Sequence, residues 1–232
     1  MKKLALGITC LTMAMCLSGC NLIDKISGLI EGGEDVPITA QQARSNLLAL
    51  GEEQGFLLNY TFEDRDGEDV DTGTVSFGMK GDTVWYLLDG ADGVALVKNG
   101  NEYTKYEYDA NNHFYLEADE AVSQADYDLA FDTGSEYLFF AQTLNGALKS
   151  DGDITVQGRE CYKYNFLFSE LLRELKVNMN MTLAVDKQIG ITLKVEATGD
   201  VEDDSVMLNM EMSSFVIGDS VTLPTLVPAN VA

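Results

Sequence analysis

The sequence predicts a mainly β domain of the α+β class, built as an antiparallel meander with two or three helices. Three observations support this prediction: apolar and polar residues alternate along most of the chain, short turns separate these segments, and two stretches have helical spacing. Alternating segments that follow one another through tight turns are typical of antiparallel sheets. We expect residues 38–232 to form one domain, because this length suffices for a sizeable core.

A helix is expected to open this domain. Thr39 and Gln42 have the spacing of a reciprocal capping box, apolar residues recur along one face over 40–50, and Gly51 and Gly55 bracket the end of the helix. An acidic turn is expected at 64–69. Strands are predicted at 56–63, 75–79, 83–88, 94–98, 102–108 and 113–117.

The alternation stops in the middle of the chain, where a second helix is predicted over 137–144. Gly134 and Ser135 precede its helical pattern, and Gly146 ends it. A short helix is also predicted at 170–176. Further strands are predicted at 153–157, 160–168, 177–186, 189–198 and 205–217, of which the last three form a meander.

The N-terminus has the three parts of a bacterial lipoprotein signal. Two lysines precede an apolar run over 4–17, which is too short to span a bilayer comfortably, and Leu17-Ser-Gly-Cys20 resembles a lipobox. This resemblance implies a signal peptide over 1–19, lipidation of Cys20 and a lipidated tether over 20–37. The protein would then be anchored in the cell membrane on its extracytoplasmic side. The alternative is an ordinary secretory signal with a chance cysteine.

Net charge and cysteine content limit the binding partners and the disulfide bonds that we expect for this chain. The chain has 15 basic and 38 acidic side chains, a net charge of −23, and loss of Lys2 and Lys3 with the signal makes it −25. Such a surface repels phosphate backbones, so we expect no nucleic acid partner. Without the signal, and with Cys20 acylated, only Cys161 remains as a free thiol. No internal disulfide is expected, and we expect a monomer held together by core packing.

Catalytic and metal-binding patterns are not found in the sequence. Cys161 as a nucleophile would need a basic partner, yet the one histidine, His113, is distant in sequence; Cys161 is expected to be an apolar strand residue. The acidic residues around Gly67 do not place glycine and glutamate as a calcium loop requires, so a solvated turn is expected, with adventitious calcium as the alternative. We therefore expect no enzyme, no cofactor and no metal.

Methionines gather on the closing strands, and they indicate a candidate binding face. Methionine is flexible and polarizable, and it is over-used where a surface accepts varied apolar shapes. The alternative is that these side chains fill the gap under a packed helix. The predicted ligand-binding residues are Met179, Met181, Leu183, Leu193, Leu208, Met210 and Met212, with Tyr162, Tyr164 and Phe166 from an earlier strand.

The order of the elements and two local patterns resemble the lipoprotein-carrier superfamily. The patterns are the hairpin Met181-Thr-Leu-Ala-Val-Asp186, Lys187-Gln-Ile-Gly190 and Ile191-Thr-Leu-Lys-Val-Glu196, and the segment 215–224, which resembles a closing strand before a proline. The resemblance implies a half-open β-barrel with helices on its concave face, and a membrane-anchored, non-catalytic lipoprotein that binds a lipid or acyl chain in an apolar cavity. The carrier itself is soluble, so an anchor at Cys20 is a departure from it. The alternative function is a structural or protein-interaction module of the cell envelope with a fully packed core.

Overall fold

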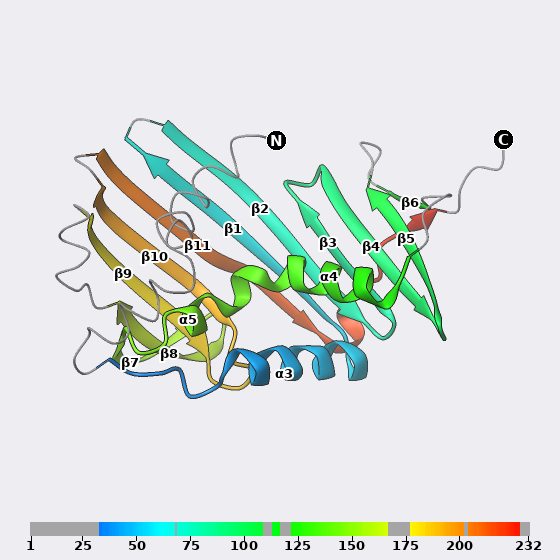
Figure 1. Cartoon of the computed structure of the whole chain (residues 1–232), viewed down its shortest axis with the longest axis horizontal. Helices are drawn as coiled ribbons and strands as arrows, with labels where there is room; N and C mark the ends of the chain where they lie inside the picture. Colours follow the sequence, from blue (N-terminus) through cyan, green and yellow to red (C-terminus); the bar gives the residue numbers. More distant parts are fainter. Residues whose placement is uncertain are drawn as a thin grey trace. The chain divides into compact units, whose positions relative to one another are not determined.

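A computed structural model describes residues 33–67, 69–108, 113–116, 122–166, 177–201 and 204–227 (Figure 1). The helices are α3 (Ala40–Glu53), α4 (Gln124–Ser135) and α5 (Phe140–Thr143), with 3-10 turns at Glu136–Phe139 and Gly218–Ser220. The strands are β1 (Phe56–Asp66), β2 (Asp69–Lys80), β3 (Thr83–Leu88), β4 (Asp92–Asn99), β5 (Glu102–Tyr108), β6 (Phe114–Leu116), β7 (Leu148–Val156), β8 (Arg159–Phe166), β9 (Val177–Asp186), β10 (Thr192–Val201), β11 (Asp204–Ile217) and β12 (Leu226–Val227).

These strands form one 12-stranded sheet in the order β12-β6-β5-β4-β3-β2-β1-β11-β10-β9-β8-β7. The order consists of two consecutive meanders, β1 to β6 and β7 to β11, that join where β11 lies beside β1. Neighbours such as β3 and β4, or β9 and β10, are antiparallel, whereas β12 runs parallel to β6. β12 and β7 are the edges, so the sheet is not closed. The predicted fold class is confirmed: a mainly β, open, largely antiparallel sheet, with three helices among the described residues.

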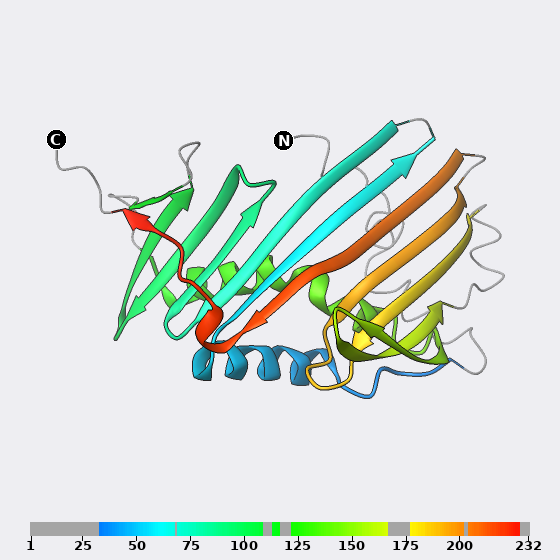
Figure 2. The ribbon, with the colours of Figure 1, turned by 180° about the vertical axis from the view of Figure 1, so that it is seen from behind.

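The chain divides into two compact units. The first unit consists of Met1–Ala43, Thr61–Gly73 and Leu138–Met212, and the second of Arg44–Tyr60, Thr74–Tyr137 and Ser213–Ala232. β1, β2 and β11 each contribute residues to both units. Within the first unit, β8, β9 and β10 lie side by side (Figure 2).

In the second unit, helices approach one face of the sheet through glycines. Phe77 of β2 makes an edge-to-face contact with Phe131 of α4, with ring centroids 5.4 Å apart. A Cβ atom built at Gly134 of α4 would lie 2.3 Å from Cδ2 of Phe77, and one at Gly51 of α3 would lie 2.6 Å from Sδ of Met79. Only glycine allows such close approaches, because real Cβ contacts are longer.

The other face of the sheet in this unit is also buried. Trp85 of β3 pairs with Gly78 of β2, and a Cβ atom at Gly78 would lie 2.2 Å from Cζ2 of Trp85. The indole ring therefore lies over the glycine. Buried Trp85, Ala95, Phe114 and Val221 form one cluster, against which Leu57, Tyr106, Tyr108, Val216 and Leu226 pack.

The helices agree with the sequence only in part. The capping box of α3 is confirmed: the backbone N–H of Thr39 donates to Oε1 of Gln42 at 3.0 Å, and that of Gln42 donates to Oγ1 of Thr39 at 3.3 Å. However, α3 continues through Gly51 to Glu53. The helix predicted at 137–144 is wrong in its start, since α4 begins at Gln124 and already contains Gly134; a 3-10 turn and the short α5 occupy 136–143.

Most predicted strands are found. Those at 83–88, 102–108 and 177–186 have the predicted bounds, while β1 and β2 extend further into the acidic segment and leave a turn around Gly67. β12 was not predicted, because its pairing with β6 joins distant parts of the chain. The short helix predicted at 170–176 lies outside the described residues.

Candidate functional site

Predicted ligand-binding residues share one face of β8 to β11. In the pairing register, Ala197 lies between Met181 and Leu208, and Val195 lies between Leu183 and Met210. Residues directly opposite each other in antiparallel strands point to the same side of the sheet. Tyr164 pairs with Leu183, and Leu193 and Met212 lie two residues from members of this row. We call this the apolar face: Met181, Leu183, Leu193, Leu208, Met210, Met212, Tyr162, Tyr164 and Phe166.

Most of the apolar face is buried. Leu183, Leu193 and Met212 are fully buried, Met181, Tyr164 and Met210 are at most 4% exposed, and Leu208, Tyr162 and Phe166 are half-buried. Met179 of β9 pairs with Gly199 of β10, but the side chain of Met179 lies outside the described part.

The opposite side of the same strands is polar. Nζ of Lys194 lies 3.0 Å from Oε1 of Glu196 and 3.2 Å from Oε2 of Glu211. The hydroxyl of Thr182 donates to Oδ1 of Asn165 at 3.2 Å. Apolar and polar residues thus alternate along most of β9 and β10, with buried Ala184 as an exception, and this makes the apolar face the inner one.

Helix α5 closes one end of the apolar face with buried polar groups. The backbone N–H of Ala141 donates to Oγ1 of Thr192 at 3.1 Å, and Thr192 lies opposite Val185. Nε2 of Gln142 donates to the carbonyl oxygens of Gly190 at 2.6 Å and of Ile38 at 3.3 Å. We call this group, Gln142, Thr192 and the turn from Asp186 to Gly190, the polar end.

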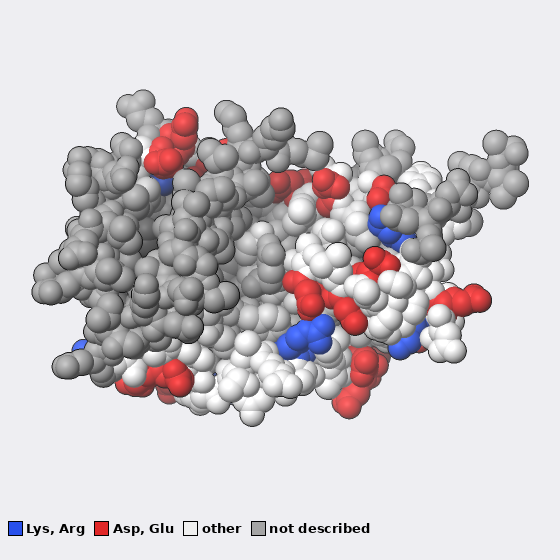
Figure 3. All heavy atoms as spheres, viewed as in Figure 1, with Lys and Arg blue, Asp and Glu red and all other residues white. Residues whose placement is uncertain are grey.

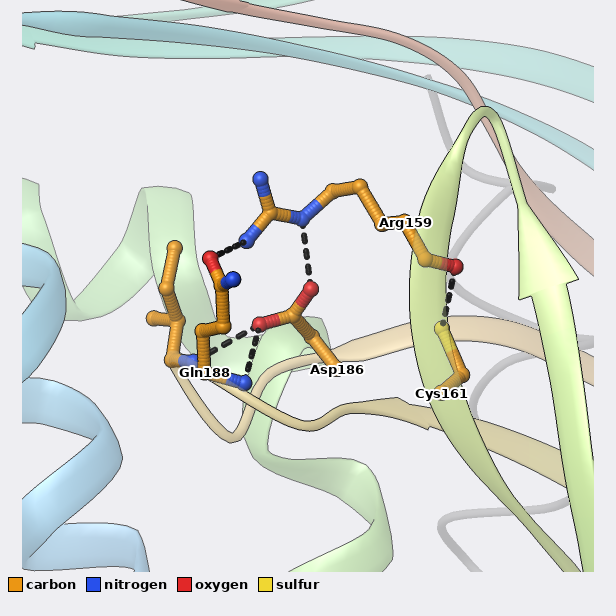
Figure 4. Close-up of polar contacts among 5 residues, drawn as sticks. Arg159, Cys161, Asp186 and Gln188 are labelled. Atoms are coloured by element: carbon orange, nitrogen blue, oxygen red, sulfur yellow. Dashed lines mark hydrogen bonds and ion pairs between the residues drawn. The ribbon is translucent and has the colours of Figure 1, made fainter.

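Asp186 organises the turn of the polar end (Figure 4). Its Oδ1 accepts hydrogen bonds from the backbone N–H groups of Gln188 and Ile189, at 2.9 and 2.7 Å, and its Oδ2 accepts one from Nε of Arg159 at 2.5 Å. Asp186 is 1% exposed, so this buried carboxylate has an opposite charge and three donors. Gly190 has a φ of +90°, which favours glycine at the end of the turn.

The N-terminal segment joins the same end of the unit. The backbone N–H of Glu34 donates to the carbonyl oxygen of Leu148 at 2.7 Å, and that of Val36 donates to Oδ1 of Asn145 at 3.0 Å. Val36 is buried. Glu34 and Val36, which the sequence places in the predicted tether, are therefore bonded to Leu148 of β7 and to Asn145 between α5 and β7.

Reactive groups in the first unit are held in their neutral forms. Burial, and after it the charge of Asp186, raises the pKa of the Cys161 thiol to about 11. Its Sγ donates to the carbonyl oxygen of Arg159 at 3.5 Å (Figure 4). Burial also raises the pKa of Tyr164 to about 12. Because the thiolate is the nucleophilic form, Cys161 is poorly suited to covalent catalysis.

Acidic residues at the β1–β2 turn crowd one another. Burial and the charges of Asp66 and Asp71 raise the pKa of Asp64. In the described part of the chain, no three His, Cys, Asp or Glu side chains are placed to hold a metal ion. On the surface shown in Figure 3, basic side chains lie next to some of the scattered acidic ones.

Sequence reasoning missed Gln142 as part of this site. The signal for it is weak: one amide side chain inside the apolar run 137–144. Asp186 lies in the hairpin that carries the family resemblance, but the sequence alone assigns it no role. Its burial and its pairing with Arg159, distant in sequence, become visible only in the structure.

Comparisons with known proteins find only distant structural similarities to this chain. No family model and no curated protein matches it. Among solved structures, Pseudomonas aeruginosa MucB in its complex with MucA is 14% identical with a TM-score of 0.34, over 79% of this chain and 59% of MucB. The lipoprotein LppX of Mycobacterium tuberculosis is 11% identical with a TM-score of 0.31, over 79% of this chain and 99% of LppX. LprF of Mycobacterium bovis is 12% identical with a TM-score of 0.29, over 81% of this chain and 98% of LprF.

These likenesses are distant, and they show nothing about what this chain binds. The chain spans less than two thirds of the length of the MucB chains, 57% to 60%. None of the described helices has the length and apolar character needed to cross a bilayer.

Proposed function

We propose that this chain is a membrane-anchored lipoprotein of the cell envelope that binds a lipid or acyl chain on its apolar face and catalyses no reaction. The observation that carries the proposal is the set of paired apolar side chains across β8 to β11, with methionine at three of its positions. Methionine has several rotatable bonds and tolerates ligands of varied shape.

The separation of polar and apolar sides supports binding on the inner side of this sheet. Lys194, Glu196 and Glu211 form ion pairs on one side, while Leu183, Val195 and Met210 form a buried row on the other. Ligand sites of this kind are mostly apolar, with a small number of placed polar groups. The polar end supplies such groups.

The anchor belongs to the same proposal. Residues 1–19 would be removed, Cys20 would be acylated, residues 20–37 would form the tether, and residues 38–232 would form one domain. Several acyl chains hold a protein on a bilayer durably, whereas one gives only marginal binding. Mass spectrometry of the protein extracted from membranes tests this: acyl chains on an N-terminal Cys20 are expected, and an unmodified N-terminus would contradict it.

A second candidate function, a protein-interaction module with a fully packed core, has one observation in its favour. β7 is an edge strand whose residues 149–155 are exposed, so its backbone can pair with another chain. Yet the register breaks between Ser150 and Asp153, and Asp151 and Asp153 form ion pairs with lysines. An irregular register and charged side chains at a sheet edge disfavour the addition of a strand from another chain. This observation therefore favours the lipid-binding proposal over the interaction module.

Binding is tested with the chain from residue 21 onward, purified and then stripped of lipid. Co-purifying lipid, detected by mass spectrometry before stripping, and saturable uptake of a fluorescent fatty acid are expected. Failure of both would overturn the proposal. Recovery of one protein partner from membranes, without any lipid, would favour the interaction module instead.

Two variants on β11 locate the binding face. Leu208 is half-buried on the apolar face, and Met207 is half-buried on the opposite side of the same strand. Leu208→Trp is expected to weaken fatty acid binding at least about tenfold, because the larger side chain occupies space that the ligand needs, at about 1.4 kcal/mol for each factor of ten. Met207→Trp is the matched control and is expected to leave binding unchanged. Equal effects would place the ligand elsewhere.

A further inference from the structure

We propose that Gln142 contacts the polar end of the bound ligand, and that this ligand ends in an uncharged hydrogen-bond donor such as an amide or hydroxyl group. The inference rests on the proposed function and adds the class of ligand. Gln142 is 8% exposed, and its Oε1 has no hydrogen-bond partner among the described residues.

The orientation of the Gln142 amide follows from its neighbours. Nε2 has two protons and faces two carbonyl oxygens, those of Gly190 and Ile38. If the amide were reversed, its oxygen would face these two acceptors without any donor. The network therefore assigns Oε1 as the atom left to accept a hydrogen bond.

Gln142 lies where the apolar face ends. Its helix is bonded through Ala141 to Thr192, which lies opposite Val185 of β9. Val185 is two residues from Leu183, and Thr192 adjoins Leu193 of the apolar face. An amphiphile whose chain lies along β9 and β10 would thus bring its polar end to Gln142.

Charge at the polar end selects against an anionic ligand. The free atom, Oε1, is an acceptor, and an acceptor cannot bond a carboxylate or phosphate oxygen that has no proton. The buried carboxylate of Asp186 lies in the same turn, and both nearby cations are already paired, Arg159 with Asp186 and Lys187 with Asp153. A net charge of −23 adds to the repulsion of anions.

A hydrogen-bond donor on the ligand would supply the partner that the buried Oε1 of Gln142 lacks. A buried acceptor without a partner is destabilising, and most buried polar groups in native proteins have one. A ligand with an N–H or O–H group satisfies Oε1, whereas an ester of the same length leaves it unpaired. We expect a preference of about tenfold for the donor ligand, equivalent to about 1.4 kcal/mol.

The test compares three ligands with the same acyl chain: hexadecanamide, methyl hexadecanoate and hexadecanoate at pH 8. Each competes with a fluorescent fatty-acyl probe for the chain from residue 21 onward. The amide is expected to bind about tenfold more tightly than the ester, and more tightly than the anion. Gln142→Met is expected to abolish the difference between amide and ester while the ester still binds, which shows that the variant is folded.

Gln54→Met is the matched control, because Gln54 is an exposed glutamine that lies outside the polar end. It is expected to keep the preference for the amide. If the wild-type chain binds amide and ester equally, or prefers the anion, this inference is overturned while the proposed function stands. If it binds none of the three ligands, the proposed function fails. If Gln142→Met does not fold, a crystal structure of the wild-type amide complex decides: the amide N–H on Oε1 supports the inference, and water alone there overturns it.

Discussion

Replacing Asp186 by alanine is expected to destabilise the protein severely. The substitution removes the acceptor for the backbone N–H groups of Gln188 and Ile189 and for Nε of Arg159. Asp186 is 1% exposed and the Arg159 side chain 17%, so water cannot easily replace the lost partner. The buried N–H group of Ile189, the partly buried one of Gln188 and one cation lose this acceptor together.

The size of the effect follows from the burial of the pair. Removing one partner of a buried ion pair costs about 3–5 kcal/mol, because the other charge stays buried without compensation. We expect a loss of about 4 kcal/mol in the free energy of unfolding. For a chain of this length, about 2–4 °C per kcal/mol gives a decrease in Tm of about 8–16 °C.

Asp153→Ala provides the matched control. Oδ2 of Asp153 lies 2.7 Å from Nζ of Lys187, but the Asp153 side chain is 66% exposed. Exposed ion pairs contribute about 0–1 kcal/mol. Urea unfolding followed by circular dichroism measures both variants in the chain from residue 21 onward. If Asp186→Ala and Asp153→Ala lose the same stability, the turn is not held by a buried charge and the reasoning is refuted.

Three further predictions concern other parts of the chain. Gly78→Ala displaces Trp85, the one tryptophan of the chain, so the free energy of unfolding is expected to fall by about 1–3 kcal/mol. The tryptophan fluorescence is expected to shift to longer wavelength, and an unchanged emission spectrum would contradict the displacement. In the chain from residue 21 onward, Cys161 has a pKa of about 11 and should resist alkylation at pH 8 until the protein is unfolded, whereas rapid labelling of the folded protein would disprove its burial. Because the pKa of Asp64 is raised, its charge destabilises the folded state above that pKa. Asp64→Asn should therefore add about 0.5 kcal/mol to the free energy of unfolding at pH 7 and nothing at pH 3, which calorimetry at both pH values measures.

The sequence predicted local features well where local chemistry decides them. Thr39 and Gln42 form the expected capping box, and β9 has its predicted bounds. The face shared by Met181, Leu183 and Met210 follows from strand periodicity, because side chains alternate between the two sides of a strand. Whether that face binds a ligand remains a prediction.

The helix bounds that were predicted from glycines are wrong because tertiary packing determines where these glycines lie. Gly51 and Gly134 were interpreted as helix boundaries, since glycine disfavours helices. Both lie inside helices because a side chain of the sheet, Met79 or Phe77, occupies the place of their Cβ atoms. No local pattern distinguishes a glycine that ends a helix from one that allows close packing. The same limit applies to Gln142, whose partners Ile38 and Gly190 are distant in sequence.

The two units bury their sheet faces with different side chains, and this difference bears on where a ligand can enter. In the second unit, Phe77 contacts Phe131 while Gly134 holds α4 close to the ring, so an inserted chain would have to separate helix from sheet. In the first unit, Met181 and Met210 can change rotamers within the apolar face. Because interiors are close-packed, we expect the proposed ligand to enter among the flexible side chains of the first unit. A bulky substitution on the apolar face therefore tests binding more clearly than one beside Phe77. Beside Phe77, the substitution would disturb folding, and loss of binding would not be distinguishable from loss of structure.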